Sequence, residues 1–387
     1  RWVKRQPAID STRVYMYGNS HNGFGALLTA MNIPSEISSL YVTAPPLIYK
    51  PKSGDKRERQ LGKTTVSLPT DINYPGTTNP IQIWDFCDMR DWSRINKQGG
   101  LPFIQAINGK NDTKAGWVQK NHWYDTVNAY RQGGKWYWDQ RVHNGDNALF
   151  TTLETQTDYT RYFTNKSYPA FSFCTINQNP GTGDPANGDP YGAINGYLDW
   201  DNNSINDLNC SYSINCFIKT FYVGGVADAE QFDSCYTDIT LRRTQNFHPL
   251  AGQTITWTNY DTGNNLLQSG NFVYDGKQIT IAAVKIKKPG STISLAISNC
   301  FNRQNEVVKA EEACSLIKTT DGYTVVMKAR SDQHAVLDIF DIAGHSVRQA
   351  QHELHSGNNN IHLQLPSGLY LLKVSSDEIR FTGKMIF

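Results

Sequence analysis

Residues 13–28 read Arg13-Val14-Tyr15-Met16-Tyr17-Gly18-Asn19-Ser20-His21-Asn22-Gly23-Phe24-Gly25-Ala26-Leu27-Leu28. The segment opens with β-branched and aromatic residues, a run that is typical of a buried strand. It closes with small and apolar residues that favour a helix. We therefore expect a strand, a sharp turn over residues 18–23 and then a helix.

Ser20 stands in this turn, two residues after Gly18 and three before Gly23. A serine on a sharp strand-to-helix turn needs small neighbours, because the backbone there is strained and packs closely against the next elements. Such a turn points the first helical amides at the serine, so the N–H of His21 is placed to stabilise an oxyanion. The alternative is an ordinary turn that happens to contain a serine.

The composition indicates an extracellular, β-rich protein of two or three domains. The chain has 387 residues, enough for several independent cores. Its 37 basic and 35 acidic side chains give a formal charge of +2, which implies no polyanionic partner such as nucleic acid. No apolar run approaches the roughly 18 residues that a membrane-spanning helix needs.

Seven cysteines are spread thinly, and all but Cys87 lie from Cys174 onward. We expect disulfides formed in an oxidising compartment. Cys210 and Cys216 are spaced to close a short loop, and a further set is expected to pair within itself: Cys174, Cys235, Cys300 and Cys314. No CxxC spacing indicates a zinc site.

The first section of the chain alternates strands and helices, which predicts a parallel sheet. Further strands are expected at 37–44, 101–107 and 135–142, with a helix over 117–131 between the last two. In parallel sheets, functional groups gather beyond the carboxyl ends of the strands. Ser20, Asp112 and His143 all follow such ends.

These three residues have the chemistry of a catalytic triad. A serine hydroxyl is a poor nucleophile, so a neutral imidazole must take its proton, and a carboxylate must orient that imidazole. Asp88 and Asp91, in a long irregular segment from about 50 to 100, are alternative acids. Two other histidines fit less well: His21 points away from its sequence neighbour, and His122 falls within the predicted helix.

The motif around Ser20, the segment Asn108–Asp112 and the histidine after the last strand together resemble the catalytic half of an α/β-hydrolase. The nearest likeness is to secreted esterases, polyester depolymerases and prolyl-oligopeptidase-like peptidases. The resemblance implies that Ser20 is the nucleophile, His143 the general base and Asp112 the orienting acid. The turn around the nucleophile, called the elbow in this family, commonly has glycine two residues after the serine, whereas this chain has Asn22 there.

An α/β-hydrolase normally has several strands before its elbow, and few residues precede this one. We therefore expect the missing N-terminal half of the sheet to come from the same polypeptide or from another chain, since a central strand needs neighbours on both sides. Residues 1–6 look like the end of a helix that leads into the serine strand.

From about residue 168, short strand-like runs alternate with turn-rich segments, which predicts a β-sandwich. Within it, Asp199-Trp200-Asp201-Asn202-Asn203 begins like a calcium loop but lacks the glycine and glutamate expected later in that motif. Calcium is therefore the lesser alternative to a solvated Asn/Asp turn. Apart from it we expect no metal and no cofactor.

The tail, from about Ser315, predicts a second small, Ig-like β domain. Leu365-Pro366-Ser367-Gly368-Leu369-Tyr370 and the terminal Lys384-Met385-Ile386-Phe387 resemble the type A C-terminal sorting domain of the Bacteroidetes type IX secretion system. The resemblance implies export across the outer membrane and binding to the translocon or an outer-membrane shuttle protein. His352-Glu353-Leu354-His355 has the wrong spacing for a helical zinc pair.

Together these observations predict three domains: an α/β-hydrolase catalytic half at 1–164, a β-sandwich at 165–304 and a sorting domain at 305–387. They predict a secreted serine hydrolase that cleaves an ester, on carbohydrate or elsewhere, or a peptide. The alternative is a non-catalytic cell-surface or adhesive protein with a relic hydrolase fold.

Overall fold

The computed structural model describes residues 9–49, 58–59, 62–74, 77–91, 101–155, 159–230, 232–298, 300, 314–319, 321–341, 344–376 and 379–387. The chain divides into two compact units, Arg1–Cys300 and Phe301–Phe387, each with its own core. The finer boundaries predicted at 164/165 and 304/305 stay predictions. The helix end expected at residues 1–6 lies outside the described residues.

The first part of the larger unit is built on a five-stranded sheet with the order β1-β2-β5-β6-β8. The first four strands run parallel and the last is antiparallel. Their bounds are β1 Tyr15–Asn19, β2 Ser39–Thr43, β5 Phe103–Gly109, β6 Lys135–Asp139 and β8 Gly192–Ile194. The strands predicted from the sequence thus form one parallel sheet with neighbouring carboxyl ends.

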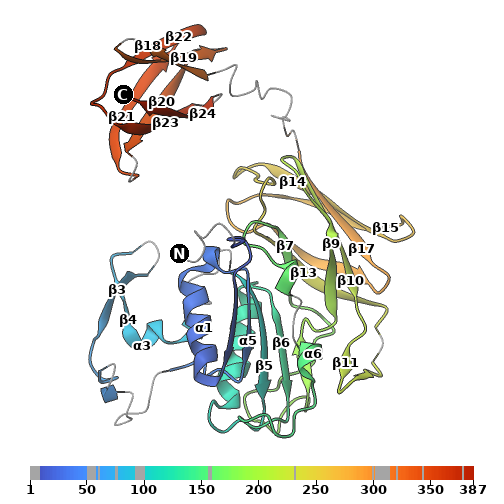
Figure 1. Cartoon of the computed structure of the whole chain (residues 1–387). Helices are drawn as coiled ribbons and strands as arrows, with labels where there is room; N and C mark the ends of the chain where they lie inside the picture. The colour runs from blue at the N-terminus through green and yellow to red at the C-terminus, as the bar shows by residue number, and fades with distance from the viewer. Residues whose placement is uncertain are drawn as a thin grey trace. The chain divides into compact units, whose positions relative to one another are not determined.

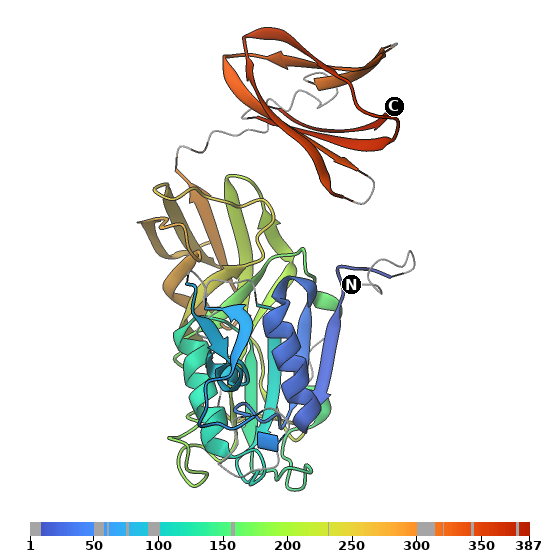
Figure 2. The same cartoon turned by 90° about the vertical axis from the view of Figure 1, so that its left-hand side faces the viewer.

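The helices that connect these strands lie on one face of the sheet. Because the strand order advances in one direction and crossovers are right-handed, successive connections return over the same face. Figures 1 and 2 show α1 (Ser20–Asn32) and α5 (Trp117–Ala129) on that face. The connection from β2 to β5 adds a hairpin and a short helix, and a further short helix precedes β2: β3 Pro69–Asn73, β4 Pro80–Gln82, α3 Ile83–Phe86 and η2 Pro34–Glu36.

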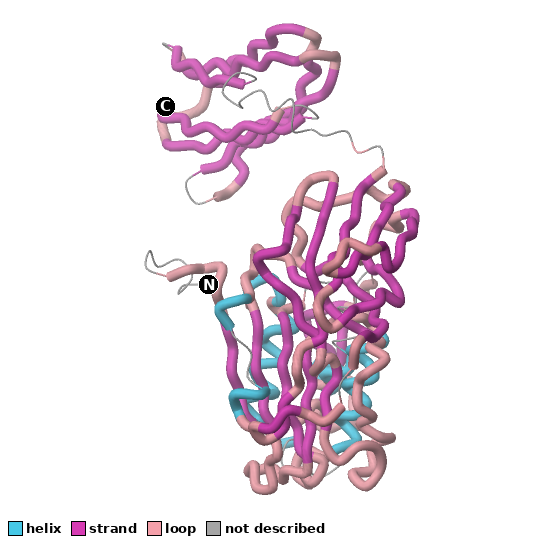
Figure 3. Tube along the Cα trace, turned by 90° about the vertical axis from the view of Figure 1, so that its right-hand side faces the viewer, coloured by secondary structure: helices cyan, strands magenta, loops and turns pink. Residues whose placement is uncertain are grey.

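The opposite face of the sheet is covered by the β-sandwich (Figure 3). Alternation along β6 explains this: Trp136 and Trp138 point into the helical core, and Tyr137 points into the core shared with the sandwich. The sandwich sheets are β9 Leu198–Asp207, β10 Ser211–Ile218, β17 Ser291–Ile297, β14 Thr254–Asp261 and β15 Leu266–Val273, and β7 Tyr168–Ser172, β13 Ser234–Arg242 and β16 Thr280–Lys287.

Several short elements complete the larger unit. They are α6 Thr152–Thr155, η3 Tyr159–Arg161, β11 Tyr222–Val223 and β12 Val226–Ala227. None of the described helices has the length and apolar character required to cross a membrane.

The serine strand β1 is an edge strand among the described residues, with β2 as its neighbour. Val14, Tyr15 and Met16 are half-buried, and Tyr17 is 65% exposed. The side of β1 away from β2 therefore has no described strand beside it, and the strands expected there stay a prediction.

The smaller unit is a two-sheet β domain. One sheet has the order β18-β19-β22 and the other β21-β20-β23-β24. Their bounds are β18 Cys314–Thr319, β19 Gly322–Ala329, β20 Gln333–Asp341, β21 Ser346–Leu354, β22 Gly357–Leu363, β23 Leu369–Ser376 and β24 Arg380–Ile386. The terminal Phe387 packs on Tyr323 and Tyr370, with ring centroids 5.0 and 5.8 Å away.

The predicted short-range disulfide is wrong. Cys210 bonds to Cys300, and Cys216 is a buried free thiol in the core of the sandwich. The reason is register: Cys216 lies inside β10 and faces the core, whereas Cys210 precedes the strand, beside the end of β17. Of the other candidates, Cys174 and Cys235 contact each other as free thiols, and Cys314 is buried and free.

Candidate active site

Ser20 lies at the junction of β1 and α1 in a strained conformation. Its φ of 52° is in the left-handed region that few non-glycine residues adopt. A Cβ on Gly18 would lie 2.5 Å from the carbonyl oxygen of Asn22 and 2.7 Å from the Cα of Gly23. The end of the strand and the first turn of the helix therefore pass so closely that only glycine fits at position 18.

Gly23 also allows a close approach. A Cβ there would lie 3.0 Å from the carbonyl oxygen of Gly18 and 3.1 Å from the side chain of Pro45. The close approach to the strand is made by Gly23, one residue after Asn22. The helix can therefore carry Asn22 where the commoner motif has a glycine.

The three predicted residues lie within hydrogen-bonding distance of one another. Ser20 Oγ is 2.7 Å from His143 Nε2, and His143 Nδ1 is 2.9 Å and 3.0 Å from the two carboxylate oxygens of Asp112. The Asp112 side chain is 1% exposed and that of His143 is 22% exposed, so the acid is buried and the base is open to solvent. This is the order of contacts that nucleophile activation requires.

The alternative residues lie elsewhere. Asp88 forms a two-point ion pair with Arg90, and the carboxylate hydrogen-bonded to His143 Nδ1 is that of Asp112. His122 is exposed on α5 and approaches Arg90 at 3.5 Å. The ring of His21 is exposed, 5.3 Å from the ring of Tyr49, while its backbone N–H lies in the first turn of α1. Amides in that turn have no partner within the helix.

The carboxylate of Asp112 is held by its own loop. Its Oδ1 accepts hydrogen bonds from the backbone N–H groups of Lys114 and Ala115, both at 3.0 Å. Behind this turn, the fully buried Lys120 donates to the carbonyl oxygen of Ala115 at 3.3 Å. Burial lowers the pKa of Lys120 to about 8, and the charge of Asp112 opposes that shift.

The loop that carries His143 is organised by Asp139, a residue that no sequence pattern singles out. This fully buried carboxylate pairs with Arg141 at 2.7 Å and accepts from the backbone N–H groups of Leu149 and Phe150 at 2.8 and 3.1 Å. A Cβ on Gly109 would collide with the carbonyl oxygen of Arg141, so a glycine there lets the Asp112 and His143 loops meet. The one mark of Asp139 in the sequence is its place at the end of a strand otherwise rich in aromatic residues, which does not by itself point to a role.

The predicted Asn/Asp turn or calcium loop at 199–203 is wrong, because these residues lie inside strand β9. Asp199 is surrounded by cations instead: Arg161 at 2.7 Å, Lys135 at 3.5 Å and Lys219 at 3.9 Å. Within the described ranges, no group of three or more His, Cys, Asp or Glu side chains is arranged to hold a metal ion.

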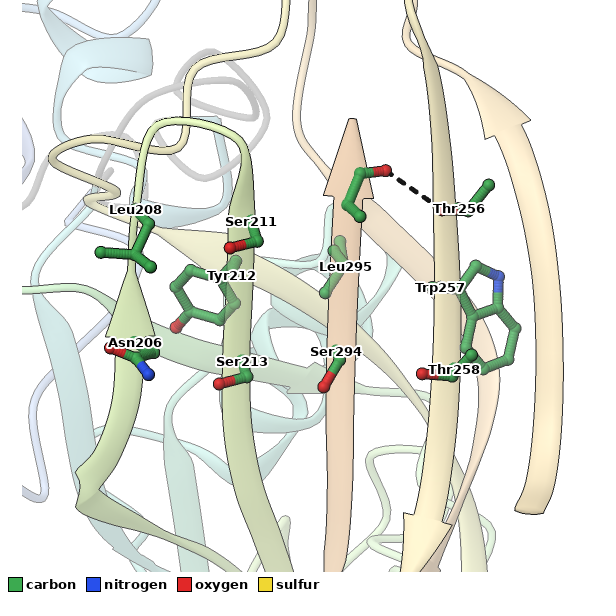
Figure 4. A pocket seen from close by; sticks show the side chains of 11 residues that line it. Asn206, Leu208, Ser211, Tyr212, Ser213, Thr256, Trp257, Thr258, Ser294 and Leu295 are labelled. Carbon is green, nitrogen blue, oxygen red and sulfur yellow. Dashed lines mark hydrogen bonds between the residues drawn. The ribbon is translucent and has the colours of Figure 1, made fainter. Parts of the chain in front are cut away.

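A separate shallow hollow of about 330 Å³ lies on the sandwich sheet formed by β9, β10, β17 and β14 (Figure 4). One row across it consists of short polar side chains that face each other on neighbouring strands: Asn206, Ser213, Ser294 and Thr258. None of the triad residues lines it. The hollow is therefore separate from the candidate active site.

The tail matches a known family. Residues 319–387 fit the model described as "Secretion system C-terminal sorting domain". The chain carries a type IX sorting tail. It is therefore a cargo of the type IX secretion system, destined for the cell surface or the medium, and the tail interacts with that machinery.

Comparison with solved structures gives weak likenesses to part of the chain. No curated protein matches the sequence. Among solved structures, a β-glucuronidase from Parabacteroides merdae is 11% identical over 41% of this chain and 28% of its own, with a TM-score of 0.14. The BSP domain of a biofilm associated protein is 10% identical over 49% of this chain and 50% of its own, with a TM-score of 0.16. Likenesses this weak carry no argument.

Proposed function

We propose that the chain is a secreted serine hydrolase of the α/β-hydrolase type, which cleaves ester or peptide bonds through an acyl-enzyme. The observation that carries the proposal is the continuous contact from Ser20 Oγ through His143 to Asp112. It is supported by the left-handed φ of Ser20 and by the origin of all three residues at the carboxyl ends of parallel strands.

In this mechanism, Ser20 Oγ bonds to the substrate carbonyl carbon as its proton passes to His143 Nε2. Asp112 keeps the other nitrogen of the imidazole protonated and stabilises the cation that forms. The N–H of His21 donates to the oxyanion. The tetrahedral intermediate then expels the alcohol or amine, which takes the proton from His143. A water molecule, deprotonated by His143, finally releases the acid and restores Ser20.

The proposal extends to three finer points. The substrate is an ester, on carbohydrate or elsewhere, or a peptide. Strands from the same polypeptide or another chain continue the sheet beyond β1 and supply a second oxyanion donor. The tail, of type A, binds the translocon or an outer-membrane shuttle protein during export.

Labelling with a fluorophosphonate tests the proposal directly. The chain is expected to be labelled, and to hydrolyse p-nitrophenyl acetate, and Ser20→Ala is expected to abolish both. Ser35→Ala is the matched control, because Ser35 is exposed in the same unit and away from the elbow. A folded wild-type chain that resists labelling and has no esterase activity would refute catalysis and favour the non-catalytic surface protein.

A further inference from the structure

A cavity of about 580 Å³ lies beside β6. It is formed where Tyr137 of β6 faces α6 and residues 219–225, elements that Figure 1 shows next to one another. None of Ser20, Asp112 and His143 lines it. Binding of a ligand in this cavity therefore does not depend on whether Ser20 is a nucleophile.

The walls of this cavity are largely apolar and aromatic. The rings of Tyr137 and Phe221 are nearly parallel, with centroids 6.1 Å apart, and both side chains are almost fully buried. At the rim, Leu153 is 88% exposed and Tyr222 is 48% exposed. Such surfaces favour a ligand with an apolar body of matching size.

One wall is positively charged. Lys219 lines the cavity and is backed by the cluster in which Lys135, Arg161 and Lys219 surround the single carboxylate of Asp199. Although burial opposes its charge, the pKa of Lys219 is raised, by Tyr137 and Asp199 among other groups. This cluster has more cations than anions in a partly buried place, which is unfavourable unless an anion binds or a proton leaves.

The proton that leaves belongs to Lys135. Burial lowers its pKa to about 7, the charge of Asp199 opposes this, and Lys219 and Arg161 add to it. The Lys135 amine also shares a hydrogen bond with Lys219. Near neutral pH the cluster therefore sheds part of its excess charge through Lys135, and an anion beside Lys219 would reverse that loss.

The other polar wall excludes a second anion. Glu154 lines the cavity. Its carboxylate accepts hydrogen bonds from the backbone N–H groups of Gly225 and Thr151, both at 2.6 Å, and of Gly224 at 3.2 Å. Burial opposes this charge, but these hydrogen bonds lower the pKa of Glu154. Glu154 thus stays ionised, and a ligand with one negative group fits the cavity better than a dianion.

We propose that this cavity binds a small organic monocarboxylate with an aromatic body, its carboxylate on Lys219 and its ring against Leu153 and Tyr222 at the rim. Binding takes up a proton at Lys135, whose charged neighbours are Asp199, Arg161 and Lys219. The affinity is accordingly highest below pH 7, where Lys135 is already protonated, and falls as the pH rises to 8.

Calorimetric titration of the full chain with 3-phenylpropionate tests this, with the neutral 3-phenylpropanamide as the comparison. The carboxylate is expected to bind at least tenfold more tightly than the amide, and to lose affinity at least threefold from pH 6 to pH 8. At pH 7.5, the observed enthalpy should differ between two buffers of different ionisation enthalpy, because a proton is taken up.

Variants locate the site. Lys219→Met is expected to weaken 3-phenylpropionate at least tenfold, whereas Lys277→Met, at a largely exposed lysine outside this cavity, leaves it unchanged. Equal binding of carboxylate and amide by the wild-type chain would overturn the proposal without any variant. So would the absence of binding at millimolar concentration, or undiminished binding by Lys219→Met.

Discussion

At the scale of single residues, two close approaches set the geometry around Ser20. The strained φ of Ser20 persists because the strand end and helix start are locked together over Gly18 and Gly23. The residue types predicted the strand, the sharp turn at Ser20 and the helix that follows, because β-branched and aromatic residues, glycines and small apolar residues stand there in that order. They could not predict which glycine after the serine carries the contact, because that depends on the position of Pro45.

Gly18→Ala is expected to destabilise the larger unit by about 1–3 kcal/mol, the usual cost of forcing extra atoms into a packed site. The added Cβ would sit 2.5 Å from a backbone oxygen, which cannot move without displacing the start of α1. Gly25→Ala is the matched control. Gly25 lies in α1 with nothing within 4 Å of an added Cβ, so this change should leave stability unchanged or increase it. Denaturant unfolding measures both, and equal effects would contradict this account.

The buried Lys120 makes a pH-dependent contribution to stability. Its pKa of about 8 in the folded chain is below the 10.5 of an exposed lysine, so between these values the unfolded chain binds the extra proton. Stability due to this group therefore rises with pH across that window, by about 3 kcal/mol in all. The stability of the wild type, relative to that of Lys120→Met, should therefore increase between pH 8 and pH 10.5. Unfolding of both proteins at several pH values measures this difference. A constant difference between the two proteins would show that Lys120 titrates normally.

At the scale of elements, alternation and turn signals predicted β1, α1, β2, β5, α5 and β6 to within a few residues. These sequence signals gave wrong or no predictions where a polar side chain is buried and forms tertiary contacts. Asp199 looks like part of a solvated turn because its neighbours are Asp and Asn, yet tertiary cations draw it into β9. Asp139 could not be predicted for the opposite reason: a single acid at a strand end forms no pattern, although this one holds the loop of His143.

Asp139→Asn is expected to loosen the loop over residues 140–150 while leaving the elbow at Ser20 in place. The change removes the charge opposite Arg141 in a buried pair, which typically costs about 3–5 kcal/mol. Faster hydrogen exchange in this loop and weaker fluorophosphonate labelling are the expected readouts. Asp146→Asn, on the same loop but exposed, is the control. Unchanged exchange in Asp139→Asn would contradict the role given to Asp139.

At the scale of the whole molecule, the described residues form three cores: one under α1 and α5, one shared by the sheet and the sandwich, and one in the tail. The tail was predictable because its sequence signals are local to one short domain. The cysteine pairing was not, since Cys210 and Cys300 are 90 residues apart and meet only through the order of the sandwich strands.

This disulfide joins the start of β10 to the end of the larger unit, just before the segment that leads to the tail. For a loop of 90 residues, cross-linking the unfolded chain is expected to stabilise the fold by about 4–5 kcal/mol. The double variant Cys210→Ser, Cys300→Ser should lose about that amount in denaturant unfolding. Reduction of the wild type should lower its stability by the same amount, whereas reduction of the double variant should leave its stability unchanged. If reduction destabilises the double variant equally, another pair of cysteines is oxidised, and the contact of Cys174 with Cys235 makes that pair the first to examine.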